Sequence, residues 1–389
     1  MSTFRTITDM DVSGKRLLVR ADLNVPMQDG QVTDTTRIDR FADGMRPLLA
    51  RGARLIVLTH FGRPDGQACD KMSVRPLADA LSRALDRPVA FCPANHGPQA
   101  ETAANALQDG DVLLCENVRF EAGETANDPD LSRAFARLGE VFVNDAFSCA
   151  HRAHASTEGV AHHLPAAAGP LLAEEIGALT AALENPRRPA VAIVGGSKVS
   201  SKIPVLRNLV TKVDKLIIGG GMANTFLFAD GVPMGRSLHE ADQVDTVARI
   251  RALAAMARDF KPNAEHRTVP TQGCGDGEMI LDAGPASVAR FAEALQSSHT
   301  ILWNGPLGAF EMQPFDAATK ALAREAARLT RDAGVTSVAG GGDTVAALNA
   351  AQVTDQFTYV SAAGGAFLEW LEGRTLPGVA ALITTKDAA

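Results

Sequence analysis

Glycine-rich turns follow the apolar runs in the second half of the sequence. Their positions are 195–198 (GGSK), 219–221 (GGG), 304–308 (NGPLG), 340–344 (GGGDT) and 364–365 (GG). Glycine lets backbone N–H groups approach a phosphate closely, and a helix that starts after the turn adds the positive end of its dipole. Because ligands in open α/β sheets bind at the carboxyl ends of strands, this repetition predicts a phosphate site, with a nucleotide as the ligand.

Polar and basic side chains follow the apolar runs of the first half instead. They include Asp22, Asn24, His60, Arg63, Arg119 and Arg152. The three arginines follow three separate runs, and a planar guanidinium binds an oxyanion through two parallel hydrogen bonds. If these runs are parallel strands, the arginines converge at one sheet edge and form a site for a small polyanion. A single arginine of this kind is more often an ion-paired surface group.

Lys198 and Lys202 stand four residues apart after the first glycine turn, and Asp343 follows the turn at 340–342. If a helix begins directly after the GGS turn, both ammonium groups lie on one of its faces and reach the same phosphate. Plain surface charge is the alternative for the lysines. An N-cap is the alternative for Asp343.

Three common nucleotide motifs are absent. The sequence has no G-x-x-x-x-G-K-[ST] loop, no strand-linked G-x-G-x-x-G with a downstream acid, and no protein-kinase HRD/DFG set. The first absence excludes a Walker-A enzyme, and the second disfavours an NAD-dependent dehydrogenase.

Alternating strand-like and helix-like segments predict the fold. Strands are expected at 16–22, 54–60, 89–92, 112–116, 141–145, 190–194, 215–218, 300–303, 335–339 and 357–360. Helices are expected at 77–85, 130–138, 317–333 and 344–352, with a further helix over 164–188 between the two sets of strands. The alternation indicates βαβ crossovers, and the continuously apolar strands indicate burial on both faces. We therefore expect an α/β protein with two doubly wound parallel-sheet domains.

Composition narrows the class of protein. The 389 residues are 46% hydrophobic and 21% charged, with a formal net charge of −7. This balance excludes a disordered chain and disfavours nucleic acid or an anionic membrane as a partner. There is no apolar run long enough to span a bilayer, no secretion signal, and no CxxC spacing among the five cysteines. These features favour a cytoplasmic protein without structural zinc or disulfides.

The ordered set of motifs resembles the phosphoglycerate kinase family. The matching segments are VRADLNVP (19–26), TRID (36–39), THFGRP (59–64), ENVRF (116–120), NDAFSCAHRAHAS (144–156), GGSKVSSKI (195–203), IIGGGMANTF (217–226), WNGPLGAFE (303–311) and AGGGDT (339–344). The resemblance implies reversible phosphoryl transfer from 1,3-bisphosphoglycerate to MgADP, giving 3-phosphoglycerate and MgATP, in glycolysis, gluconeogenesis or carbon fixation.

The resemblance also implies roles for the first-half residues. Asp22, Asn24 and Arg37 match positions that hold the hydroxyl and carboxyl end of the glycerate, and Arg37 also matches a catalytic position that neutralises charge on the transferred group. The positions that bind the non-transferred 3-phosphate are matched by His60, Arg63, Arg119 and Arg152.

In the second half, Lys198 matches a position that acts on the transferred phosphoryl group, and Lys202 one that acts on nucleotide phosphate. Asp343 matches the carboxylate that reaches the nucleotide-bound Mg²⁺. Gly341, Gly342 and Thr344 match amide donors at a helix start, the two glycines being counted as catalytic. Nucleoside contacts are implied for Asn304, Pro306 and Glu311, with Glu311 on the ribose, and an adenine slot for Gly196, Ser197, Gly220 and Gly284.

For the domains, the resemblance implies two Rossmann-like units joined by a helical hinge that closes on the bound substrates. The expected divisions are a 3-phosphoglycerate domain over 1–170, a hinge helix over 171–188, a nucleotide domain over 189–371, and a tail over 372–389 that packs back on the first domain. A monomer is expected. The stretch 265–279 departs from the family pattern and leaves the adenine edge undetermined.

Two other interpretations stay open. One is a kinase for another carboxylate acceptor, which the four groups assigned to a second phosphate disfavour. The other is a catalytically silent nucleotide-binding relative. Such a relative is expected to lose Arg37, Lys198, Lys202 or Asp343, and all four are present.

Overall fold

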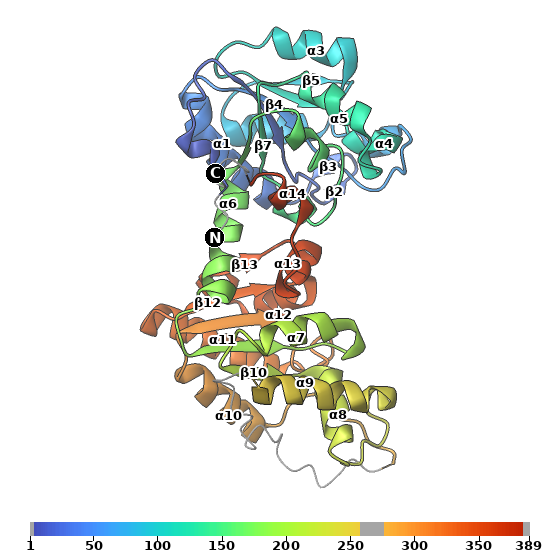
Figure 1. Ribbon diagram of the computed structural model, residues 1–389, viewed down its shortest axis with the longest axis vertical. Coiled ribbons are helices and arrows are strands. Elements are labelled where there is room, and N and C mark those ends of the chain that lie inside the picture. Colours follow the sequence, from blue (N-terminus) through green and yellow to red (C-terminus); the bar gives the residue numbers. More distant parts are fainter. Residues whose placement is uncertain (1–3, 257–275, 384–389) are drawn as a thin grey trace. The chain divides into compact units, whose positions relative to one another are not determined.

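The computed structural model describes residues 4–256 and 276–383, and the chain folds into two compact units. The first unit holds the chain up to Glu175 together with the segment that begins at Thr375. The second unit runs from Ile176 to Arg374. Each unit is built on one parallel sheet, and the colours of Figure 1 let the reader follow both sheets along the chain.

The sheet of the first unit has six parallel strands. Their order is β5 (Val89–Cys92), β6 (Val112–Cys115), β4 (Arg54–Leu58), β1 (Arg16–Arg20), β7 (Val141–Asn144) and β8 (Ala166–Ala168). The helices of this unit are α1 (Thr36–Ala50), α2 (Leu77–Leu85), α3 (Gly97–Asn105), α4 (Ala122–Thr125), α5 (Pro129–Ala136) and α14 (Pro377–Ala380). A short antiparallel pair, β2 (Met27–Gln28) and β3 (Gln31–Val32), lies between β1 and α1.

The sheet of the second unit has five parallel strands. Their order is β10 (Lys215–Ile218), β9 (Ala190–Val194), β11 (Thr300–Asn304), β12 (Thr336–Gly340) and β13 (Tyr359–Ser361). The helices are α7 (Ile203–Leu209), α8 (Gly220–Ala229), α9 (Val244–Met256), α10 (Pro285–Gln296), α11 (Ala317–Ala333), α12 (Gly342–Ala351) and α13 (Gly364–Leu371). Helix α11 packs against α10 and α12, whereas α9 packs against α7 and α8.

Both cores confirm the interpretation of the apolar runs. Every residue of β9 and β11 is buried, as expected for strands that are covered on both faces. In the first unit, β1 and β4 pack against the apolar stripes of α1 and α2, where Leu77, Leu81 and Leu85 recur at intervals of four. No helix among the described residues is both long and apolar enough to cross a membrane.

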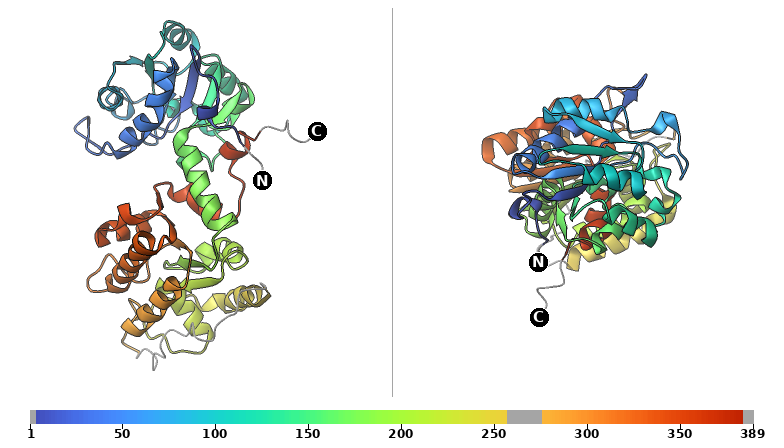
Figure 2. Two further views of the ribbon diagram at one scale, coloured as in Figure 1. Left: turned by 90° about the vertical axis from the view of Figure 1, so that its left-hand side faces the viewer. Right: turned by 90° about the horizontal axis from the view of Figure 1, so that it is seen from above.

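The predicted helix over 164–188 is only partly correct. Residues Ala166–Ala168 form β8, which pairs with β7 in the register Phe142↔Ala166. The helix α6 then spans Pro170–Leu179 and continues as a π-helical segment over Thr180–Glu184, which Figure 2 shows as one continuous green helix. Alanine favours helix intrinsically, but here strand pairing at the sheet edge overrides that preference.

Smaller differences occur at element ends. The strands expected at 335–339 and 357–360 lie at Thr336–Gly340 and Tyr359–Ser361, and the helix expected at 344–352 begins at Gly342. The segment that contains α14 pairs with the first unit. The backbone N–H of Gly378 donates to the carbonyl of Ala150 at 2.9 Å, and Asn144 Nδ2 donates to the carbonyl of Gly378 at 3.1 Å.

A buried carboxyl group holds the start of α6. Asp145 follows β7 and is 3% exposed, and its Oδ1 accepts hydrogen bonds from the backbone N–H groups of Leu171 (2.7 Å) and Leu172 (3.4 Å). Its Oδ2 has no hydrogen-bond partner among the described residues. Burial raises the pKa of Asp145 to about 7, and the two backbone donors only partly oppose this rise.

The raised pKa predicts a pH-dependent effect of the substitution Asp145→Asn. Because the folded state holds this proton more tightly than the unfolded state, the contribution of Asp145 to stability is greatest below pH 4 and is lost as the pH rises toward 7. An asparagine at this position does not titrate, so its contribution to stability does not fall as the pH rises. Relative to the wild type, we therefore expect the unfolding free energy of the variant to rise between pH 4 and 7, by up to about 1.4 kcal/mol per pH unit, and then to level off.

Chemical denaturation of both proteins at several pH values measures this difference. A difference that is the same at pH 4.5 and pH 8 would show that Asp145 does not titrate in this range. A constant offset from the buried amide of asparagine does not affect the comparison.

Candidate functional site

In the first unit, the loops after β1 and β4 meet the start of α1. Asp22 Oδ2 accepts a hydrogen bond from Arg37 Nη1 at 2.8 Å, and the same nitrogen donates to the carbonyl of Asn24 at 3.3 Å. Asn24 Oδ1 accepts from the backbone N–H of Gly62, in the loop after β4, at 3.2 Å. The structure thus brings Asp22, Asn24 and Arg37 together, as the sequence predicts.

His60 lies at the carboxyl end of β4 and is nearly enclosed, with 6% of the residue exposed. Its Nδ1 lies 3.1 Å from Nη2 of Arg20, which is itself 1% exposed. Burial lowers the pKa of His60 to about 2, and the positive charges of Arg20, Arg119 and Arg37 add to this effect. The ring is therefore a neutral hydrogen-bonding group rather than a cation.

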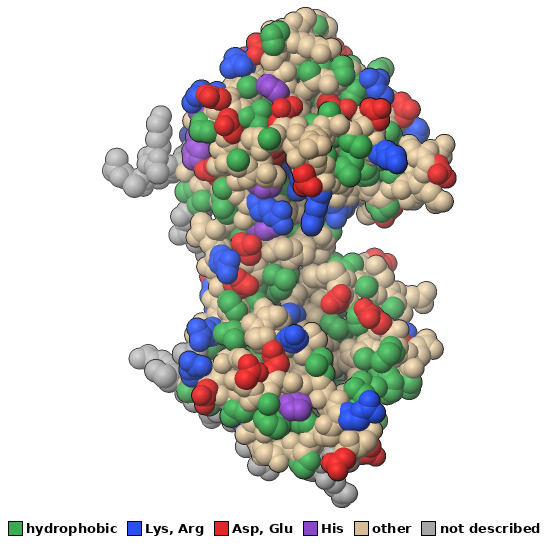
Figure 3. Space-filling model, turned by 90° about the vertical axis from the view of Figure 1, so that its right-hand side faces the viewer, with side chains coloured by type: hydrophobic (Ala, Val, Ile, Leu, Met, Phe, Trp, Pro, Cys, Tyr) green, Lys and Arg blue, Asp and Glu red, His purple; other side chains and the backbone are tan. Residues whose placement is uncertain are grey.

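The predicted arginines differ in how firmly they are held. Arg119 is half-buried, and its Nη1 donates to the carbonyl of Gly62 at 2.7 Å, whereas its Nε is buried without a partner among the described residues. Burial lowers the pKa of Arg119, and the nearby arginines Arg20 and Arg152 act in the same direction. Arg63 and Arg152 are exposed. Figure 3 shows blue Lys and Arg side chains gathered beside purple His side chains on the face of the first unit in view.

In the second unit, Lys202 and Asn304 tie together the ends of neighbouring strands. Lys202 Nζ donates to the carbonyl of Gly195 (2.5 Å) and to Oδ1 of Asn304 (2.6 Å). Asn304 Nδ2 donates to the carbonyl of Gly340 at the end of β12 (2.8 Å). The turns are packed so tightly that a Cβ on Gly195 would lie 1.8 Å from the carbonyl oxygen of Pro306. A larger residue cannot stand at that position.

The two lysines do not share a helical face, which corrects the expectation from their spacing. The α-helix begins only at Ile203, so Lys202 is its N-cap residue, and the exposed Lys198 lies in the preceding loop. Burial of Lys202 lowers its pKa to about 8, while the charge of Asp343 acts in the opposite direction. The two lysines are therefore separate cations in different surroundings.

The fourth glycine turn starts a helix, as expected. Gly341 is the N-cap of α12 and has a φ of 99°, a conformation that favours glycine. Thr344 is buried in the first turn, and its Oγ1 accepts from the backbone N–H of Gly305 at 2.7 Å. Gly342 and Asp343 are exposed at the same helix end. This places the first backbone N–H groups of α12 and one carboxylate beside each other.

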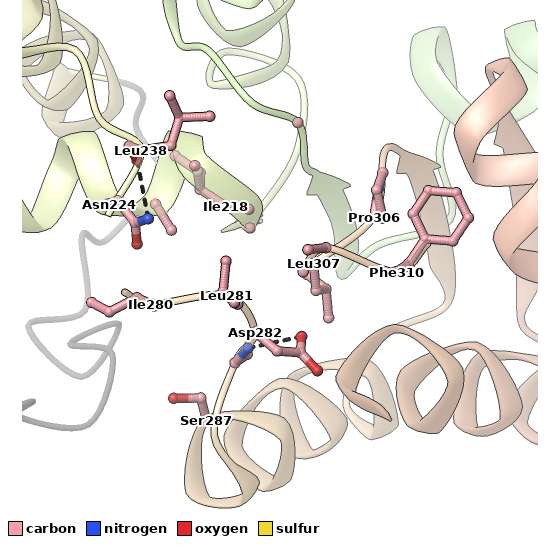
Figure 4. A pocket seen from close by; sticks show the side chains of 18 of the residues that line it. Ile218, Asn224, Leu238, Ile280, Leu281, Asp282, Ser287, Pro306, Leu307 and Phe310 are labelled. Carbon is pink, nitrogen blue, oxygen red and sulfur yellow. Dashed lines mark hydrogen bonds between the residues drawn. The ribbon is translucent and has the colours of Figure 1, made fainter. Parts of the chain in front are cut away.

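A cavity of about 500 Å³ lies in the second unit, beside the glycine turns. Seven of the predicted nucleotide residues line it, namely Gly196, Ser197, Gly220, Gly284, Pro306, Glu311 and Asp343. Figure 4 shows that apolar side chains, among them Ile218, Leu238 and Leu281, supply much of the remaining wall. Such a wall suits a flat, largely apolar ring. Lys202, Asn304, Gly341, Gly342 and Thr344 do not line this cavity but hold the adjacent strand ends.

Two polar side chains of the cavity wall, Asn224 and Asp282, hold the wall itself. Asn224 Nδ2 donates to the carbonyl of Leu238 at 3.1 Å. The Asp282 carboxylate accepts from the backbone N–H groups of Ala283 (2.9 Å) and Ala318 (3.0 Å), and its burial raises its pKa. Most of the stretch 265–279, expected near the adenine edge, lies outside the described residues, but Met279 is part of the wall.

The single carboxylate of Asp343 suits a Mg²⁺ ion that is also bound by substrate phosphates, and it does not suit a metal ion held by protein side chains alone. Magnesium is commonly bound by one or two carboxylates together with substrate phosphates. Asp343 provides one exposed carboxylate at the helix start. In the described part of the chain, the only group of three possible metal ligands is Asp22, His60 and Cys149. Each of the three is hydrogen-bonded to an arginine, Asp22 to Arg37 and the other two to Arg20.

The sequence gives no role to several polar residues that lie beside the predicted site. Arg20 is recognisable in the motif VRAD as a basic residue at a strand end, but its burial depends on packing that no local pattern reveals. Glu124 and Ser156 are likewise fully buried polar residues of the first unit. The apolar wall of the cavity comes from separate segments, and no spacing rule joins Ile218 to Leu281.

Comparison with known proteins agrees with the motifs. The phosphoglycerate kinase family model matches residues 7–374. The phosphoglycerate kinase of Rhodospirillum centenum is 54% identical over 392 residues, which cover 97% of this chain and 99% of the relative. That of Methylobacterium radiotolerans is 56% identical over 396 residues, covering 98% and 99%.

Solved structures agree as well. The structure of phosphoglycerate kinase from Coxiella burnetii has a TM-score of 0.88 and 41% identity, and the match covers 100% of both chains. That from Pyrococcus horikoshii has a TM-score of 0.77 and 28% identity, with 98% of each chain covered. The predicted two-domain α/β fold is confirmed, and so is a phosphotransferase enzyme. The chain belongs to the phosphoglycerate kinase family.

Proposed function

We propose that this chain catalyses reversible phosphoryl transfer from 1,3-bisphosphoglycerate to MgADP, giving 3-phosphoglycerate and MgATP. The main support is that the family model matches residues 7–374 and that each unit contains a cluster of site residues. Asp22 and Arg37 belong to the cluster of the first unit, and Lys202 and Asn304 to that of the second. The units then have separate tasks, with the anionic substrate on the first and the nucleotide on the second. We propose that a monomer does this in the cytoplasm.

In the first unit, His60, Arg63, Arg119 and Arg152 bind the 3-phosphate, which does not react. Two features support this assignment. Arg119 has a buried Nε without a partner among the described residues, and His60 is a neutral donor among cations. Asp22, Asn24 and Arg37 hold the glycerate end. Binding energy from the distant phosphate thereby positions the reacting acyl phosphate.

In the second unit, the cavity of about 500 Å³ holds the nucleoside. Gly196, Ser197, Gly220 and Gly284 line the base, and Glu311 contacts the ribose hydroxyls. Lys202 and Asn304, with the amides at the start of α12, lie beside the phosphates. Pro306 completes the wall at the tightly packed end of β11.

Asp343 holds the magnesium ion of the bound nucleotide. When bound, Mg²⁺ neutralises charge on the phosphate oxygens and orients them. The Asp343 carboxylate is exposed at the N-terminus of α12 and close enough to Lys202 to influence its pKa.

The transfer itself needs no general base, because the acceptor carboxylate of 3-phosphoglycerate is already a nucleophile. Catalysis is therefore positioning and stabilisation of charge on the transferred group. We assign this to Lys198, Lys202 and Arg37 with the amides of Gly341 and Gly342. Because these residues belong to two units, closure of the units on their ligands is part of the proposal.

A coupled assay of ADP formation from MgATP tests the function. It compares 3-phosphoglycerate, glycerate without the phosphate, and no acceptor, each with and without Mg²⁺. Turnover that requires both Mg²⁺ and the 3-phosphate is expected. Equal turnover of glycerate would favour another carboxylate acceptor, and nucleotide binding without turnover would favour a silent relative.

Replacement of Lys198 by alanine separates catalysis from binding. The Lys198 ammonium is exposed in the loop before α7, so its loss should leave the wall of the cavity intact. We expect kcat to fall by about 100-fold or more, with little change in the dissociation constant of MgATP. Lys212→Ala is the matched control, because Lys212 lies in the same unit and pairs with Glu184. Unchanged turnover with weakened nucleotide binding would refute the assigned role.

The lowered pKa of Lys202 predicts that nucleotide binding depends on pH. Burial lowers its pKa to about 8, so in the free enzyme the ammonium loses its proton as the pH rises above that value. The KM for MgATP should then rise above pH 8, because a neutral amine attracts phosphate weakly. Lys202→Arg keeps its charge in this range, so its KM should stay flat between pH 7 and 9.5. Initial rates of both enzymes across this range measure the effect, and parallel profiles would contradict it.

A further inference from the structure

A chain of buried polar groups runs behind His60 in the first unit. It passes from His60 to Arg20 at the end of β1, then to Ser156, and ends at Glu124 in α4. Arg20 is 1% exposed, and Ser156 and Glu124 are 0% exposed. Burying a positive and a negative charge together is costly unless both are fully hydrogen-bonded.

The hydrogen bonds that join these four buried side chains have a fixed direction. Ser156 donates to Glu124 twice, from its backbone N–H to Oε2 (2.9 Å) and from Oγ to Oε1 (2.5 Å). Because the only hydroxyl proton points to Glu124, Ser156 Oγ is left as an acceptor, and it accepts from Arg20 Nε at 2.8 Å. Glu124 thus fixes the hydroxyl, and the hydroxyl fixes the guanidinium.

The guanidinium in turn decides which nitrogen of His60 carries the proton. Arginine has only donors, so His60 Nδ1, 3.1 Å from Arg20 Nη2, must be the acceptor. A neutral imidazole with Nδ1 unprotonated carries its proton on Nε2. Arg20 Nη1 is also held, by the carbonyl of Ala21. All three nitrogens of the guanidinium therefore have partners, and the group cannot turn without breaking them.

We propose that Ser156 and Glu124 are positioning residues for the anion site, which act through Arg20 to keep the His60 proton on Nε2, where it serves as a donor to a phosphate oxyanion. This proposal rests on the proposed function, since it assumes that His60 faces the 3-phosphate. In the opposite tautomer, Nε2 would present a lone pair to an oxyanion and repel it. A phosphate ligand thus needs this tautomer.

The other groups around His60 do not replace this control. Cys149 Sγ lies 3.9 Å from Nδ1, and the positive charges of Arg119, Arg37 and Arg20 disfavour protonation of the ring without selecting a nitrogen. His154 Nδ1 lies 3.7 Å from Glu124 Oε1 and is itself held neutral by burial, its pKa being lowered to about 4. Of the two groups that contact Nδ1 among the described residues, Arg20 Nη2 is the nearer, and because a guanidinium can only donate, it selects the tautomer.

Nitrogen NMR of protein labelled with ¹⁵N in its histidine rings tests the tautomer directly. The His60 signals are assigned by their loss in His60→Gln. In the wild type without ligand we expect an unprotonated Nδ1 and a protonated Nε2. A protonated Nδ1 would overturn the proposal without any variant, and this readout does not depend on which substrate the enzyme uses.

The variants Ser156→Ala and Glu124→Gln test the positioning role. Ser156→Ala removes the hydroxyl that accepts from Arg20, and Glu124→Gln puts an NH2 donor in place of one of the two carboxylate oxygens that accept from Ser156. We therefore expect His60 to lose its single tautomer and the KM for 3-phosphoglycerate to rise about tenfold, as for loss of one charge-assisted hydrogen bond. The KM for MgATP should be unchanged. Ser132→Ala is the matched control, because Ser132 is 1% exposed in the same unit and its Oγ donates only to the carbonyl of Asp128.

The outcomes separate this inference from the proposed function. If KM rises in the variants while the His60 tautomer stays as in the wild type, the two residues are merely structural and the inference is wrong. If the tautomer changes but titration calorimetry shows equal binding of 3-phosphoglycerate to wild type and variants, His60 does not contact the phosphate, and the inference is wrong as well. Failure of the wild type to turn over 3-phosphoglycerate at all overturns the proposed function, while the tautomer result stands.

Discussion

Parallel pairing of the strands is the constraint on which both candidate sites depend. In a parallel sheet all carboxyl ends lie at one edge, so residues that are distant in sequence meet there. Asn304 shows the consequence. It ends β11, receives Lys202 from the segment after β9, and donates to Gly340 at the end of β12. The order β9-β11-β12 therefore places three glycine turns side by side and allows their backbones to approach closely.

The first unit uses the same edge in a different chemical way. Its strand ends carry charged side chains, several of which are buried, and burial decides their protonation. Arg20 donates hydrogen bonds to Ser156 and to a backbone carbonyl, whereas burial holds the His60 ring beside it neutral. A ring that is neutral among cations can attract an anion only by donating a hydrogen bond, not by its charge. Under the proposed function, the site is therefore sensitive to the direction of hydrogen bonds and not only to the number of basic residues.

The second unit offers mostly shape and backbone groups to its ligand. Its cavity wall contains polar side chains such as Asn224 and Asp282, but these satisfy neighbouring backbone groups. Polar side chains and helix-start amides are concentrated instead at the strand ends, where Lys202, Asn304 and the start of α12 lie. In the proposed function, the apolar wall and the polar strand ends thus divide the binding of a nucleotide into two physical tasks.

The sequence by itself determined the class of fold, the strands of both sheets except β8 within a few residues, and the residue types at the strand ends. It could do so because continuous apolar runs, glycine turns and ordered motifs are local properties of the chain. Tertiary structure alone decided that Ala166–Ala168 is a strand, that Lys198 and Lys202 are on no common helix face, and that Ser156 and Glu124 stand behind Arg20. Those features follow from edge pairing, from where a helix can start against a packed turn, and from burial, and each of these depends on residues far apart in the sequence.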